Sequence, residues 1–298
     1  MELQWPLILF TSLTAWACGV FGGTGVLALL PGEGGKRGAA RKSQMPLCVA
    51  SVVLLAVGGI CVFFHLQHWE RIFNGFGHIT SGITQELIAI VVFVVVALVY
   101  FLKLRKSGDG AVPKALAWCA IAISVVLAAV CAHSYMMAAR PAWNNVLEVA
   151  SIVGAACLMG PATCAVVMAV RGDDLAAAGL PAVVGSAIGA VCTLAYAVFL
   201  QLCNSSFIDM GNYYDPTHPL KAMLDVAATA SSQAPLIWGG AVIVGAIVPL
   251  VCCALARKKG DAASWKVFGA VAVVAALAGS IFLRMAFYNI GLSVFALY

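Results

Sequence analysis

Uninterrupted apolar runs are the feature that most limits how this chain can fold. The run from Leu87 to Leu102, for example, contains no charged residue. A bilayer core about 30 Å thick is crossed by a helix of about 20 apolar residues. Over the whole chain 63% of the residues are hydrophobic and 10% are charged, whereas soluble domains carry about 25% charged residues. The sequence therefore predicts an integral membrane protein.

The apolar runs are continuous, whereas the strands of a membrane barrel would alternate between apolar and polar residues. A helix in lipid satisfies its own backbone hydrogen bonds. We therefore predict an all-α integral membrane protein, a bundle of eight transmembrane helices that forms a single anchor domain over residues 1–298. The predicted spans are 6–30, 45–66, 85–102, 115–137, 149–170, 181–202, 234–256 and 267–289.

The basic residues predict an orientation. Cytoplasmic loops of membrane proteins carry an excess of Lys and Arg. One set of alternating loops holds most of the 17 basic residues, namely Lys36, Arg37, Arg41, Lys42, Lys103, Arg105, Lys106, Lys114, Arg171, Arg257, Lys258, Lys259 and Lys266. We expect these loops to be cytoplasmic and both termini to lie outside the cell membrane (plasma or inner membrane). The net charge of +5 is then a mark of topology, and no nucleic-acid partner is expected.

Three other sequence features are given no role in chemistry. The segment before the first span lacks Lys and Arg, so it does not match the positive start of a cleavable signal peptide. The 11 cysteines are scattered and form no C-x-x-C pair, so no metal site is expected in this chain. Gly19, Gly22, Gly23 and Gly25 of the first span predict close helix packing.

The predicted outer side concentrates the groups that can exchange protons. All 5 histidines fall on or near it, and the polar residues are densest between the second and third spans: His65, His68, Glu70, Arg71, Asn74, His78 and Glu86. Histidine accepts and releases protons near neutral pH, and a carboxyl group at a membrane edge can do so as well. The inner half holds no histidine, so no haem stack is expected, although one outer haem on His65 and His133 stays an alternative.

Arg284 is the other notable residue because it lies inside the apolar run of the last span. A guanidinium in a bilayer is costly unless it is paired or reaches water. Arg284 is close to the outer end, so it can either extend to the interface or face the same cavity as Glu86 or Glu148.

Three segments resemble the membrane-anchor subunits of the dimethyl sulfoxide reductase family, the DmsC-like anchors. The opening Trp5-Pro6-Leu7-Ile8-Leu9-Phe10-Thr11 resembles the family's W-P-L-x-x-F-T. His65-Leu66, Arg71-x-Phe73-Asn74 and Gln85-Glu86 resemble its H-L-x(4)-R-x-F-N…E segment. Arg284-x-x-Phe287-Tyr288 resembles the R-x-x-F-Y element of its last helix.

The resemblance implies an anchor that oxidises menaquinol at the outer face of an anaerobic respiratory complex. It implies His65 and Glu86 as the proton-accepting groups of the quinol site, with Arg71, Asn74 and Arg284 as further quinol-binding residues. It also implies two partners on the outer face, an iron–sulfur electron-transfer subunit and a molybdopterin catalytic subunit that reduces the terminal acceptor. The clusters and the molybdopterin would belong to those partners, and this chain would bind menaquinol and membrane lipid besides its partner subunits.

Other classes of membrane protein remain open from the sequence. A polysulfide reductase or NrfD-like quinone-interacting anchor has a similar task and a similar number of helices. A small-solute transporter would show paired, interrupted helices and internal symmetry, and the sequence shows no clear repeat. A purely structural anchor would tolerate loss of every outer histidine and acid without a change in electron flow.

Overall fold

The computed structural model describes residues 3–32, 38–65, 77–107, 110–138, 140–202 and 226–291, and within these ranges the chain is helical and forms no sheet. Eight helices in the described residues are long and apolar enough to cross a membrane. The predicted all-α fold with eight spans is therefore confirmed.

The first six spans are single helices: α1 (Trp5–Leu29), α2 (Gln44–Phe63), α3 (Gly82–Lys106), α4 (Lys114–His133), α5 (Val146–Arg171) and α6 (Ala176–Leu202). The short helix α8 (Val226–Ser232) precedes the seventh span, which joins the π-helical stretch η4 (Pro235–Ile247) to α9 (Val248–Lys259). The eighth span joins α10 (Ala262–Ser264), η5 (Trp265–Gly269) and α11 (Ala270–Ile290).

Most helix ends differ by a few residues from the sequence prediction, and ends of α3, α4 and α6 are examples. Helix α3 continues through Lys106, because its last turn keeps three basic side chains where the helix dipole favours positive charge. Helix α4 already ends at His133, and the following residues form turns. Helix α6 begins at Ala176, so Pro181 lies inside it and does not open it.

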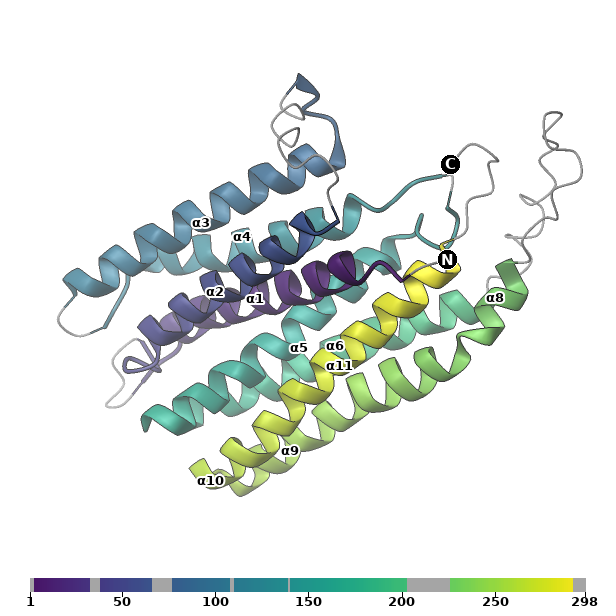
Figure 1. Ribbon diagram of the computed structural model, residues 1–298. Coiled ribbons are helices and arrows are strands. Elements are labelled where there is room, and N and C mark those ends of the chain that lie inside the picture. Colours follow the sequence, from purple (N-terminus) through teal and green to yellow (C-terminus); the bar gives the residue numbers. More distant parts are fainter. Residues whose placement is uncertain are drawn as a thin grey trace, which may run out of the picture.

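Helix α1 is the centre of the bundle and the most buried of the eight spans. It packs against α2, α4, α5 and α11. Helix α3 packs against α2 and α4, while most of its remaining surface is exposed and apolar. Figure 1 shows α2, α3 and α4 on one side of α1, and α5, α6, α9 and α11 on the other.

Glycines allow the central helices to approach one another closely. A Cβ atom built on Gly19 of α1 would lie 2.1 Å from the backbone oxygen of Ala156 in α5. A Cβ on Gly160 of α5 would lie 2.0 Å from the backbone of Gly19. Gly245 and Gly279 make a similar crossing between η4 and α11. The close packing predicted from the glycines of the first span is therefore confirmed at Gly19.

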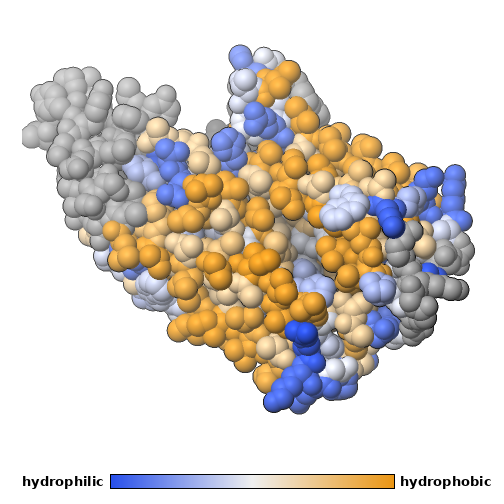
Figure 2. Space-filling view, turned by 180° about the vertical axis from the view of Figure 1, so that it is seen from behind, coloured by the Kyte–Doolittle hydropathy of each residue, from blue (hydrophilic) through white to orange (hydrophobic). Residues whose placement is uncertain are grey.

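Helix α1 begins and α11 ends at the same end of the bundle, which we call the site end (Figure 1). Figure 2 shows apolar side chains over the middle of one face, with polar side chains toward its ends. Such a distribution suits a bundle whose middle lies in hydrocarbon and whose two ends meet water.

Candidate functional site

A cavity of about 600 Å³ opens at the site end of the bundle. It lies between the beginning of α1, the end of α2, the beginning of α3, the segment from α4 to α5, and the end of α11. Most of its wall is apolar or aromatic. The lining residues that carry polar groups are Gln4, His65, Glu86, Ser134, Tyr135, Arg140, Trp143 and Tyr288. Its volume falls in the range of about 300–1,000 Å³ that is usual for small-molecule sites.

Glu86 is placed in this cavity by the close approach of α3 to the end of α4. A Cβ built on Gly82 would lie 2.9 Å from the Cα of Ser134, so the first turn of α3 depends on a residue without a side chain. Glu86 follows four residues later on the same face of the helix. The Ser134 hydroxyl donates to Glu86 Oε2 over 3.5 Å, while Oε1 is buried and has no hydrogen-bond partner among the described residues.

His65 lies in the turn that follows α2, where its side chain is exposed and also lines the cavity. The neighbouring wall is apolar and open, since Ile83 of α3 is 66% exposed and Phe63 of α2 is 48% exposed. The cavity therefore joins a buried carboxyl group at Glu86 to an exposed imidazole, and it is bordered by apolar side chains that would face lipid.

Stacked aromatic rings form the wall of the cavity next to α11. The indole of Trp143 stacks on the ring of Phe287 at 4.6 Å, and its Nε1 donates to the Phe287 carbonyl oxygen over 2.8 Å. The ring of Tyr288 meets those of Trp143, Phe287 and Tyr135 edge-on at 5.7, 5.1 and 6.1 Å. Arg140 lies over Trp143 at 4.6 Å and donates to the carbonyl oxygen of Gly291. These contacts fix the wall in one arrangement.

Two ionisable groups of this wall lie in the connection between α4 and α5. Burial raises the pKa of the Tyr135 phenol well above its ordinary value, and nearby Tyr288 and Cys131 raise it further. Tyr135 is therefore neutral and keeps its proton for donation. Desolvation lowers the pKa of the Arg140 guanidinium from its ordinary value.

Arg284 lies deeper in the bundle and is not part of the cavity wall. Its Nη1 donates to Oε1 of Glu148, and its Nη2 donates to the Ser151 hydroxyl over 2.7 Å. Arg284 is 3% exposed and Glu148 is 0% exposed, so the sequence alternative in which Arg284 reaches the interface is wrong. Asn145 caps α5 by accepting from the Leu147 backbone N–H, which places Glu148 in the first turn.

The structure brings together two of the predicted site residues. His65 and Glu86 line the same cavity, whereas Arg284 pairs with Glu148 away from it. Arg71 and Asn74 fall outside the described residues.

From the sequence alone, no site role was predicted for Trp143, Tyr135, Arg140 or Tyr288. Tyr288 stood within the R-x-x-F-Y element, so the motif carried a signal for it. Trp143 and Tyr135 lie in the irregular connection between α4 and α5. Such a segment has no periodic pattern of apolar residues that could indicate which side chains are buried. The possible haem pair is not supported as one site, because His133 is exposed and contacts Met136 Sδ at 3.4 Å without lining the cavity.

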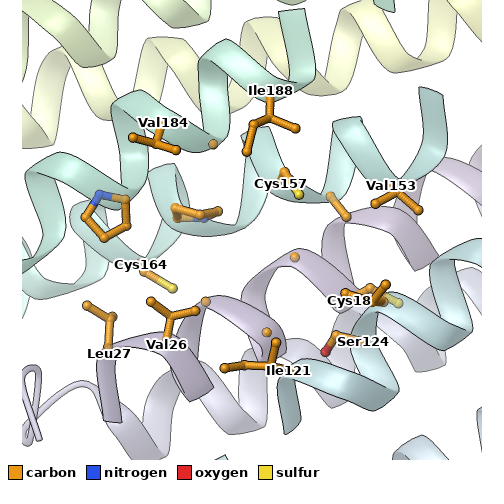
Figure 3. A pocket seen from close by; sticks show the side chains of 18 of the residues that line it. Cys18, Val26, Leu27, Ile121, Ser124, Val153, Cys157, Cys164, Val184 and Ile188 are labelled. Carbon is orange, nitrogen blue, oxygen red and sulfur yellow. The ribbon is translucent and has the colours of Figure 1, made fainter. Parts of the chain in front are cut away.

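A second cavity, of about 410 Å³, lies farther from the site end between α1, α4, α5 and α6. Val184 and Ile188 of α6 face Val26 and Ile121 across it (Figure 3). The described residues that line it include no acid, base or histidine. Of these two cavities, only the first is lined by an acid and a histidine among the described residues. Among the described residues there is also no group of three or more His, Cys, Asp or Glu side chains that could hold a metal ion.

The fold and the cavity define a class, a multi-pass membrane protein with a buried acid and an exposed histidine at one end of its bundle. Residues 1–291 match the family described as DMSO reductase anchor subunit (DmsC), and the chain belongs to this family. The family is the membrane anchor of a DMSO reductase complex, which implies a catalytic and an iron–sulfur subunit as partners. No curated protein matches the sequence.

Proposed function

We propose that this chain oxidises menaquinol in the site-end cavity and passes the electrons to an iron–sulfur partner. The observation that carries the proposal is the cavity itself, in which the buried carboxyl group of Glu86 and the exposed imidazole of His65 share one apolar-walled space. Quinol is a lipophilic molecule that loses two electrons and two protons. It needs an apolar wall to bind and polar groups to receive its protons.

The chemistry divides between the two groups. One quinol hydroxyl gives its proton to Glu86, and His65 receives the other and exchanges it with water at the mouth of the cavity. The two electrons leave for the iron–sulfur partner, and quinone remains. The exposed Phe63 and Ile83 border the cavity on α2 and α3, which supports a lateral path for quinol from the lipid.

The charge distribution supports an orientation for this reaction. Lys103, Arg105 and Lys106 end α3, and Arg257, Lys258 and Lys259 end α9, both at the end opposite the cavity. By the positive-inside rule that end is cytoplasmic. The termini, the cavity and the partner subunits then lie on the outer side of the cell membrane, so the protons are released outside.

The proposal is tested by His65→Ala and Glu86→Gln in the assembled complex. General acid–base groups contribute about 10²–10⁴-fold to a rate, so quinol-driven reduction should fall about 100-fold or more in either variant. Reduction driven by a soluble donor that feeds the partner subunits directly should be unchanged. His133→Ala is the matched control, because His133 is exposed near the same end but does not line the cavity. Full quinol-driven turnover in both site variants would contradict the proposal.

A further inference from the structure

The described part of the chain contains three buried side-chain oxygen or nitrogen atoms without a hydrogen-bond partner. They are Glu86 Oε1, the hydroxyl of Tyr288 and the hydroxyl of Thr14. Buried polar groups in native proteins are nearly always hydrogen-bonded, since an unpaired one costs about 1–3 kcal/mol. Glu86 and Tyr288 both line the site-end cavity, whereas Thr14 does not. Two of the three unpaired atoms therefore belong to side chains that line the same cavity.

Because these two side chains line one cavity, we infer that Tyr288 binds the substrate directly. Its hydroxyl and the carboxyl group of Glu86 then hold the same ring oxygen of the quinol. The inference rests on the function proposed above and adds a binding residue to it. Tyr288 is 5% exposed and Glu86 is 9% exposed, so bulk water cannot readily satisfy either atom.

The two groups have complementary hydrogen-bonding roles. A phenol can donate one hydrogen bond, and an ionised carboxylate accepts only. A quinol hydroxyl can accept from Tyr288 and donate to Glu86 at the same time. When the proton passes to Glu86 and the electrons leave, the ring oxygen becomes a carbonyl that accepts from both groups. The pair therefore binds the oxygen before and after oxidation.

The position of the Tyr288 ring is set by its aromatic neighbours. Its ring is held edge-on by Trp143, Phe287 and Tyr135. The Trp143 indole is in turn fixed by stacking on Phe287 and by its bond to the Phe287 carbonyl oxygen. Replacement of Tyr288 by phenylalanine should therefore keep the wall intact and remove only the unpaired hydroxyl.

The decisive experiment compares Tyr288→Phe with the unaltered complex. A hydrogen bond contributes about 0.5–1.5 kcal/mol, which corresponds to about two- to thirteenfold in affinity. We expect the Kd of a short-chain naphthoquinol and its KM to rise within about this two- to thirteenfold range. The resistance of the complex to unfolding should stay about the same, because the ring keeps its edge-on contacts with Trp143, Phe287 and Tyr135.

Two control variants separate this role from a structural one. Thr14→Val removes an unpaired buried hydroxyl that does not line the cavity, so naphthoquinol binding should not change. Tyr196→Phe removes a buried hydroxyl that donates to the Ala142 carbonyl oxygen over 3.1 Å. This variant should lose stability and keep its Kd. If Tyr288→Phe behaves like either control, the inference is overturned.

A double variant tests whether the two groups hold the same oxygen. Groups that act on one ligand atom are coupled, so the effects of Tyr288→Phe and Glu86→Gln on Kd should not multiply. Multiplicative effects would refute a shared oxygen. If the unaltered complex neither binds nor oxidises naphthoquinol, both the proposed function and the inference fall. If the unaltered complex does so and Tyr288→Phe matches it, only the inference falls.

Discussion

The buried pair of Arg284 and Glu148 allows a quantitative prediction about the stability of the bundle. Both side chains are almost completely buried, and Ser151 accepts the second hydrogen bond of the guanidinium. Removal of one partner from a buried ion pair costs about 3–5 kcal/mol, because the other charge is left uncompensated. An arginine cannot lose its proton in a protein. Glu148→Gln should therefore lower the free energy of unfolding by about 3–5 kcal/mol.

Replacement of both partners should cost much less than the two single changes together. Buried ion pairs that are exchanged for uncharged groups of similar size are often neutral in stability. We expect Arg284→Met to cost about 3–5 kcal/mol and the double variant Glu148→Gln/Arg284→Met to cost about 2 kcal/mol or less. The coupling energy of the pair is then about 4 kcal/mol or more.

The assay is reversible unfolding in mixed detergent micelles, followed for the unaltered chain and the three variants. Glu86→Gln is the matched control for the substitution, because Glu86 has no ion-pair partner among the described residues. It should change the free energy of unfolding by about 1 kcal/mol or less. If the losses from the two single variants simply add in the double variant, the pair is not coupled and the reasoning is refuted.

Two further predictions concern packing and loop contacts. Gly160→Leu should prevent normal assembly, because the added side chain would clash with the backbone of Gly19. Gly59→Ala should assemble normally, because nothing lies within 4 Å of the added Cβ. Equal yields of the two complexes after purification would contradict this prediction. Asp173→Asn should cost only about 1 kcal/mol in the same unfolding assay, since Asp173 accepts from the Ser43 hydroxyl over 2.5 Å in a partly buried contact between loops. A loss of about 3–5 kcal/mol in the free energy of unfolding, as expected for a broken buried ion pair, would contradict this prediction.

The number and order of the helices could be predicted because each membrane span is recognised from one continuous run of apolar residues. The run that contains Leu87–Leu102 needs no knowledge of its neighbours to be assigned to the bilayer. The ends of the helices were harder to predict from the sequence, as α6 shows. Proline commonly opens a helix, but Pro181 lies inside α6, which begins at Ala176.

The candidate site was predictable only in part. His65 and Glu86 are close in the sequence and stand out as polar residues beside apolar runs, and both line the cavity. The sequence offered both Glu86 and Glu148 as acids that Arg284 could face, and it could not choose between them. Glu148 is 136 positions away, and α5 and α11 are apolar on nearly all faces. The spacing of apolar residues indicates the buried face of a helix only when the opposite face is polar. The sequences of α5 and α11 therefore do not indicate which face of each helix packs against which neighbour.

The buried ion pair and the cavity wall are parts of one arrangement of α5 and α11. Glu148 stands in the first turn of α5, five residues after Trp143, and Arg284 stands one turn before Tyr288 on α11. The ion pair thus fixes the two helices next to the place where Trp143 stacks on Phe287. A site functions well when the residues that touch substrate are held by neighbours with fixed positions. Arg284 therefore supports the cavity from outside it, by holding the helix that carries the Tyr288 hydroxyl.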